Sequence, residues 1–183
     1  YHPGPEVPAH IEAILRQVSR VIVVDNEATA DSRARISGFA GHPTVELVDN
    51  PENLGIATAL NQGVERALAA GFEWIATFDQ DSSVPDGYFT ALLAAHAAYP
   101  ERGRVAVLAP LYHDRHLDFV FSSGGPLRDR LTADVPVSVA AASRHPLSAA
   151  APPAGGRFRD GFFIGESDFA FSLRCREAAL PGP

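Results

Sequence analysis

Short apolar runs alternate with stretches of helical periodicity along the amino-terminal part of the chain. Residues 21–24 (VIVV), 45–48 (VELV) and 73–78 (EWIATF) have the length and apolar character of strands buried in a sheet. Residues 54–70 place Ile, Leu, Val and Ala on one helical face, and Gly71 follows as a stop signal. This alternation predicts right-handed βαβ units and the α/β class, with a mostly parallel sheet and helices on both faces.

The same pattern extends on both sides of this region. Residues 8–19 predict a helix before the first strand, and Pro85 opens another helix that closes before Pro100. Residues 105–109 and 117–121 predict two more strands.

Composition then changes along the chain and suggests three parts of a single domain. Residues 1–122 carry the alternation of strands and helices, and they predict the part of the domain that binds the ligand. Residues 123–156 predict a loop or low-complexity insert, because 132–156 is rich in Ala, Pro, Ser and Gly and shows little periodicity. Residues 157–183 regain aromatic and apolar positions and predict a last ordered segment.

Polar residues directly follow three of the predicted strands. They are Asp25-Asn26, Asp49-Asn50 and the pair Asp79 and Asp81. Ligands of parallel sheets bind beyond the carboxyl ends of the strands, so these groups predict a site at one edge. Two carboxylates one residue apart suit Mg²⁺ or Mn²⁺, which take oxygen ligands and are often shared with phosphates. The residues equally allow Asp79 to end the strand and Asp81 to begin a turn.

Composition and charge narrow the function classes. The chain has 183 residues, enough for one domain with a real core, and no apolar run approaches the roughly 20 residues that span a bilayer. The net charge of −7 argues against a general nucleic-acid-binding surface. All 15 basic residues are arginine, so there is no lysine, and the single Cys175 excludes an internal disulfide and fits a reducing compartment.

Three blocks of the sequence resemble family 2 glycosyltransferases with the GT-A fold, and within them bacterial rhamnosyltransferases of surface polysaccharides. The blocks are VIVVDNEA, NLGIATALNQGVERALAAGFEWIATFDQDS and GRFRDGFFIGESDFAFSLRCR. The resemblance covers residues 1–122 and 156–177. It implies a Rossmann-like GT-A sheet and an inverting transfer of L-rhamnose from dTDP-L-rhamnose, with Mg²⁺ or Mn²⁺, to a glycan or lipid-linked glycan acceptor. The implied location is cytoplasmic, in peripheral contact with the inner membrane face.

The resemblance also implies roles for the donor-binding residues. Asp25 matches the aspartate that contacts the nucleotide base. Asn53 and Gly55 match a loop that passes the nucleoside and the diphosphate. Asp79 and Asp81 match the D-x-D pair, which faces the ribose and the metal-bound diphosphate.

The catalytic base is implied at Asp168, within a segment that the family writes F-I-D-x-V-D-x-E. Gly165, Ser167 and Ala170 stand where that segment has Asp, Val and Glu, and Glu166 lies one position off the pattern. Asp168 is therefore the residue expected to accept the proton of the acceptor hydroxyl.

The resemblance places Tyr1, His2 and Pro3 at the end of the family's first strand. Together with the absence of methionine, this predicts a fragment or processed product that is truncated at its amino-terminal strand. A truncated or inactive nucleotide-sugar-binding remnant is therefore an alternative function.

A haloacid dehalogenase-type phosphohydrolase is a second alternative, since there too an apolar strand ends in D-x-D. That family usually uses a lysine and places the pair after its first strand. This chain has no lysine, and two predicted strands precede the pair.

Overall fold

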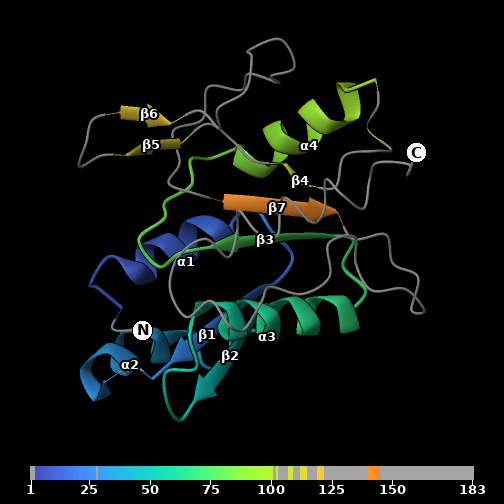
Figure 1. Ribbon diagram of the computed structural model, residues 1–183. Helices are drawn as coiled ribbons and strands as arrows, with labels where there is room; N and C mark the ends of the chain where they lie inside the picture. The colour runs from blue at the N-terminus through green and yellow to red at the C-terminus, as the bar shows by residue number, and fades with distance from the viewer. Residues whose placement is uncertain are drawn as a thin grey trace.

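The computed structural model describes residues 3–27, 29–100, 102, 107–108, 112–114, 119–121 and 140–144 (Figure 1). The helices are α1 (Val7–Leu15), α2 (Ala30–Ile36), α3 (Ile56–Ala69) and α4 (Tyr88–Ala98), and a 3-10 turn, η1 (Ser37–Phe39), follows α2. The strands are β1 (Val21–Asn26), β2 (Val45–Asn50), β3 (Trp74–Phe78), β4 (Val107–Leu108), β5 (Tyr112–Asp114), β6 (Phe119–Phe121) and β7 (Ala140–Arg144). None of these helices is both long and apolar enough to cross a membrane.

β1 and β2 form a parallel pair in which the two strands run in register. Asp25 lies opposite Asp49, and Asn26 lies opposite Asn50. Both strands extend two residues beyond the apolar runs that predict them, so each Asp-Asn pair belongs to a strand and not to a loop. The carboxyl ends of β1 and β2 therefore meet at one edge, as the sequence predicts.

Helices cover both faces of this pair. On one face, Val7 and Ile11 of α1 form a cluster with Ile36 and Phe39, and Val23 of β1 packs against it. Successive side chains of a strand point to opposite faces, so Val24 faces the other side. There α3 approaches β1, and a Cβ built at Gly63 would lie 3.9 Å from Cγ2 of Val24.

A second cluster holds α4 against β3. Val84, Tyr88 and Leu92 are buried together, and Phe78 of β3 packs against them with its ring centroid 6.2 Å from that of Tyr88. Ile14 of α1 packs against the same cluster. α1 therefore contributes to both clusters and links the β1–β2 pair to the sheet that contains β3.

The α/β class is confirmed, but the described strands do not form one continuous sheet. β1 pairs with β2, while β3 belongs to a separate sheet of order β3–β7–β4 with antiparallel pairs, and β5 pairs with β6. β7 (Ala140–Arg144) is a strand in a stretch for which the sequence predicts a loop or insert. Its letters, AAASR, have no strand periodicity; the strand is defined by its pairing with the distant β3. The division into three parts remains a prediction, because residues 157–183 lie outside the described residues.

Candidate functional site

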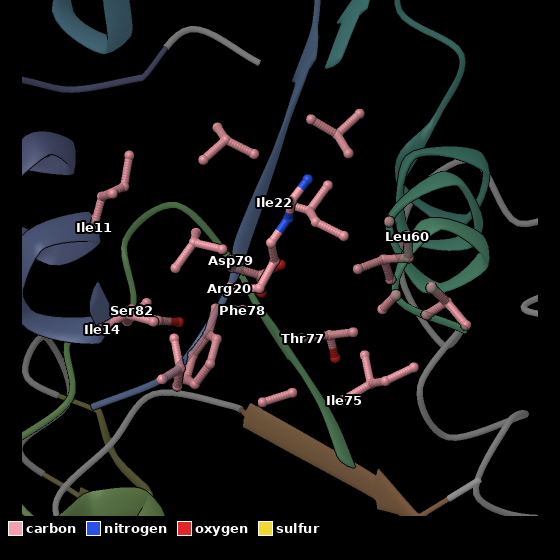
Figure 2. Close-up of a pocket in the computed structure, with 18 of the residues that line it drawn as sticks. Ile11, Ile14, Arg20, Ile22, Leu60, Ile75, Thr77, Phe78, Asp79 and Ser82 are labelled. Atoms are coloured by element: carbon pink, nitrogen blue, oxygen red, sulfur yellow. The ribbon is translucent and has the colours of Figure 1, made fainter. Parts of the chain in front are cut away.

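A cavity of about 1320 Å³ lies between β1 and β3 (Figure 2). Its walls are largely apolar and include Ile11 and Ile14 of α1, Ile22 and Val24 of β1, Leu60 and Val64 of α3, and Ile75 of β3. The carboxyl ends of the strands and the segments that follow them add acidic and amide side chains: Asp25, Asn26, Asn53, Asp79, Gln80 and Asp81. This group is called the polar end of the cavity, and it is the candidate site.

Asp25 is held at the polar end by an ion pair. Its side chain is only 2% exposed, and Nε of Arg33 in α2 lies 3.3 Å from its Oδ2. The Arg33 side chain is 46% exposed, so the pair sits at the boundary between the interior and the solvent. Because a buried carboxylate needs an opposite charge or hydrogen bonds, Arg33 both compensates and orients Asp25.

Amide side chains beside Asp25 form a connected network that ties β1 and β2 to α3. The Nδ2 of Asn50 donates to Oδ1 of Asn26 and to Oε1 of Gln62, both at 3.0 Å. Gln62 Nε2 donates back to Asn50 Oδ1 at 3.0 Å. Asn26 Nδ2 donates to Asn53 Oδ1 at 2.9 Å. Asn26 and Asn50 are both buried, and a buried polar network with its partners in place holds the strand ends in one arrangement.

The loop between β2 and α3 is shaped by the same network. Asn53 Oδ1 accepts the backbone N–H of Gly55 at 2.9 Å, and Asn26 Oδ1 accepts that of Leu54 at 3.1 Å. Gly55 has φ 82° and ψ 159°, a conformation essentially restricted to glycine. Its carbonyl accepts from the backbone N–H of Ala59 in the first turn of α3. Asn53 and Gly55 therefore set how the chain enters α3.

The end of β3 is built differently. Asp79 and Asp81 are exposed, and the backbone N–H of Ser82 donates to the Asp79 carbonyl at 3.0 Å to close the turn. His10 of α1 supports this turn through a contact of 3.1 Å between its Nδ1 and the Gln80 carbonyl. The turn thus presents two carboxylates one residue apart at the polar end.

The structure brings most of the predicted site residues to one place. Asp25, Asn53, Asp79 and Asp81 all line the cavity. Gly55 is buried beside them and acts through the loop conformation. Asp168 lies outside the described residues, and its role stays a prediction.

The sequence places Asn26 and Asn50 at the predicted site, but it does not predict the hydrogen bonds between them or the part that Gln62 plays in the network. In the sequence, Gln62 is only one polar position on a predicted helix. The signal that could have predicted the pairing of the two amides is the repetition of Asp-Asn at the ends of two neighbouring strands. That repetition stacks two amides at the same height of the sheet, within reach of the helix that follows.

The residues at the end of β3 supply two of the several oxygen ligands that a hard divalent cation takes. Among the described residues, no group of three or more His, Cys, Asp or Glu side chains is placed to hold a metal ion. Asp79 and Asp81 still supply two exposed carboxylates. Mg²⁺ is commonly bound by one or two carboxylates with substrate phosphates and water completing its shell, so this donor pair fits a metal that arrives with a diphosphate.

Comparison with known proteins adds a family to this geometry. A search of curated proteins found no match. The sequence model described as Glycosyl transferase family 2 matches residues 1–118. That range contains the cavity, the amide network and both aspartates after β3. The chain belongs to glycosyl transferase family 2.

Proposed function

We propose that the chain is an inverting glycosyltransferase that moves L-rhamnose from dTDP-L-rhamnose to a glycan acceptor. A member of this family is a glycosyltransferase, with a nucleotide-sugar donor and an acceptor. The observation that carries the finer proposal is the meeting of Asp25 with Asp79 and Asp81 at one cavity. The choice of rhamnose is supported by the resemblance of the VDN, NLGIATALNQG and DQDS segments to rhamnosyltransferases.

Asp25 and the Asn53–Gly55 loop would bind the nucleoside. Thymine carries one ring N–H donor, and the Asp25 carboxylate is an acceptor that Arg33 orients toward the cavity boundary. The ion pair with Arg33 holds this acceptor in place before a ligand arrives, so little ordering is required on binding. The β1 side of the site is therefore proposed to recognise the base.

Asp79 and Asp81 would hold the diphosphate end through Mg²⁺ or Mn²⁺. When bound, the cation supplies charge that neutralises the departing diphosphate. Both carboxylates are exposed in a turn held by backbone contacts. They can therefore bind a metal–diphosphate complex while the buried ion pair between Asp25 and Arg33 stays intact.

Asp168 is proposed as the general base. In a single displacement, the acceptor hydroxyl oxygen bonds to the anomeric carbon as the bond from that carbon to the diphosphate breaks. The hydroxyl proton passes to the Asp168 carboxylate, and the configuration at the anomeric carbon inverts. The proposed acceptor is a glycan or lipid-linked glycan, met in the cytoplasm at the inner membrane face.

A non-catalytic nucleotide-sugar-binding remnant is the second candidate. It is favoured by the Gly165, Ser167 and Ala170 positions, which depart from the family's base segment. The phosphohydrolase alternative is not supported, because the family match includes the D-x-D pair itself.

Calorimetric titration with dTDP, with and without Mn²⁺, tests the donor site. We expect Mn²⁺-dependent binding that Asp81→Asn weakens by about 100-fold, the scale of one lost metal ligand or charge-assisted contact. Asp49→Asn is the matched control, because it removes the same charge from an exposed strand end at the same sheet edge but does not line the cavity. Equal losses in both variants, or no dTDP binding at all, would refute the proposed site.

An assay of sugar transfer distinguishes an active enzyme from a non-catalytic nucleotide-sugar-binding remnant. With dTDP-L-rhamnose and a glycan acceptor, transfer is expected in the wild-type chain and is expected to be lost in Asp168→Asn while dTDP binding stays. If the chain binds dTDP but transfers no sugar to any glycan acceptor, it is a non-catalytic nucleotide-sugar-binding remnant.

A further inference from the structure

The loop 79–87, which joins β3 to α4, is attached to α1 at the end that leads into α4. Gln17, which follows α1, donates from its Nε2 to the Pro85 carbonyl at 3.0 Å. Ile14 of α1 packs against the buried cluster that contains Val84. Figure 1 shows the chain leaving β3 beside α1 before it turns toward α4. A hydrogen bond and apolar packing therefore hold this end of the loop against α1.

His10 of α1 attaches the other end of the same loop, where it leaves β3. The Nδ1 of His10 lies 3.1 Å from the carbonyl oxygen of Gln80, a residue 70 positions further along the chain. A carbonyl oxygen only accepts hydrogen bonds, so Nδ1 carries the proton and donates it. His10 is half-buried and lines the cavity, as Gln80 does. The contact therefore lies at the polar end of the cavity, beside the two aspartates that follow β3.

The oxygen that His10 contacts belongs to the residue between the two aspartates. Gln80 stands between Asp79 and Asp81, and its carbonyl is part of the peptide unit that leads into Asp81. Because a peptide unit is planar, a hydrogen bond to this oxygen fixes the plane that ends at the Asp81 Cα. On the other side of the turn, the backbone N–H of the buried Ser82 donates to the Asp79 carbonyl at 3.0 Å. The two hydrogen bonds together set the direction in which both carboxylates leave the backbone.

This backbone arrangement matters because Asp79 and Asp81 are exposed and carry the same charge. A cation that binds between them has to bring two mutually repelling side chains to one point. Binding is weaker when the backbone of the turn has to be ordered at the same time, because the lost freedom is subtracted from the affinity. A turn that is already held by α1 avoids that loss.

We propose that His10 is a positioning residue for metal-dependent binding of the diphosphate. Its Nδ1–H, donated to the Gln80 carbonyl, holds the turn of Asp79 and Asp81 in the arrangement that accepts the cation. This role rests on the proposed function, because it concerns the diphosphate half of the same nucleotide site. His10 acts through the turn and not on the ligand, so it does not affect binding of the base beside Asp25.

Three substitutions of His10 separate its two ring nitrogens. His10→Ala removes both nitrogens. His10→Asn keeps an N–H donor as many bonds from Cα as Nδ1, and His10→Gln keeps one as many bonds from Cα as Nε2. His42→Ala is the matched control, because His42 is an exposed histidine that contacts Thr44 and does not line the cavity.

Calorimetric titration with dTDP and Mn²⁺ measures the effect on ligand binding. We expect His10→Ala and His10→Gln to weaken this binding about tenfold, the scale of one lost hydrogen bond. His10→Asn and His42→Ala should bind as the wild-type chain does. Thymidine binding without Mn²⁺ should be equal in all variants, whereas general damage to α1 would weaken thymidine binding as well.

Amide hydrogen exchange of Ser82, resolved by NMR without any ligand, measures the turn itself. Exchange should be about tenfold faster in His10→Ala and His10→Gln than in the wild-type chain, and His10→Asn should restore the slow rate. If His10→Ala does not fold, the comparison of His10→Asn with His10→Gln gives the same answer.

Two results would overturn the role of His10. One is wild-type exchange and wild-type dTDP binding in His10→Ala. The other is restoration by His10→Gln but not by His10→Asn, which would mean that Nε2 contacts the ligand directly. Absence of dTDP binding in the wild-type chain would instead refute the proposed function, and the role of His10 in binding with it.

Discussion

The carboxyl end of β1 is buried and tied down by side chains, whereas that of β3 is exposed and shaped by its backbone. Asp25 and Asn26 are 4% and 6% exposed as whole residues, and Asp25 pairs with Arg33 while Asn26 bonds to neighbouring amide side chains. Asp79 and Asp81 are exposed in a turn that a Ser82 backbone hydrogen bond closes. The two ends lie at the same cavity, but they depend on different interactions.

This difference matches the two halves of the ligand that the site is proposed to bind. Recognition of a flat base benefits from an acceptor whose orientation is fixed before binding. A metal–diphosphate group carries its own charge and water, and exposed carboxylates meet it without a large desolvation cost. Folding should therefore depend on the β1 end, and metal-dependent binding on the β3 end.

The largest effect on folding is expected from Asn26→Ala. The substitution leaves the Leu54 backbone N–H without its side-chain acceptor and removes the link between Asn50 and Asn53. Unsatisfied buried groups cost about 1–3 kcal/mol each, so we expect about 3 kcal/mol of destabilisation in urea unfolding. Asp49→Ala, at the exposed neighbouring strand end, is the control and should change little.

Gly55→Ala should have the next largest effect. Any other residue at φ 82° and ψ 159° is strained, and we expect a loss of about 2 kcal/mol from the free energy of unfolding. Gly38→Ala serves as the control, since a Cβ there meets no heavy atom within 4 Å and its φ is not positive. Similar small losses in both variants would mean that the loop before α3 is free to rearrange.

Asp81→Asn should barely change folding. The side chain is exposed, so the free energy of unfolding is expected to stay within about 0.5 kcal/mol of the wild-type value. The measurement is urea unfolding of the same protein sample that is used for dTDP titration. A loss as large as that of Asn26→Ala would erase the contrast between the two strand ends.

Tyr88→Phe should have the smallest effect at neutral pH. Tyr88 supports β3 through packing, and among the described residues its buried hydroxyl has no hydrogen-bond partner. Burial raises the pKa of the Tyr88 phenol. The folded protein therefore keeps a proton that the unfolded chain releases above about pH 10, so wild-type stability falls as pH rises past that point. Thermal unfolding between pH 8 and 11 should show a shallower alkaline decline in the variant.

The sequence predicts those parts of the fold that depend on local patterns. The apolar runs of β1, β2 and β3 and the helical face of α3 are local features, and the structure contains all of them close to the predicted ranges. The same strand predictions place the Asp and Asn residues at the carboxyl ends of the strands. The meeting of the β1 and β2 ends at one edge follows from their parallel pairing, whereas β3 lies in a separate sheet of the described strands.

Other features depend on distant partners and are not visible in a local pattern. β7 has an Ala-rich sequence and is a strand through its pairing with β3, more than 60 residues away, from Phe78 to Ala140. The donors and acceptors of Asn26, Asn50 and Gln62 depend on how α3 sits over the strand ends. The cavity depends on the placement of α1 and α3 beside β1 and β3, which belong to separate sheets among the described strands.

Calorimetric titrations that compare thymidine with dTDP, with and without Mn²⁺, test most directly whether the two strand ends bind different halves of one nucleotide. If the β1 end binds the base and the β3 end binds the diphosphate, Asp25→Asn should weaken both ligands by a similar factor of about 10–100. Asp81→Asn should leave thymidine binding unchanged and weaken dTDP only when Mn²⁺ is present. If Asp81→Asn weakens thymidine binding as much as dTDP binding, or if Asp25→Asn affects neither, the two strand ends do not divide one nucleotide between them.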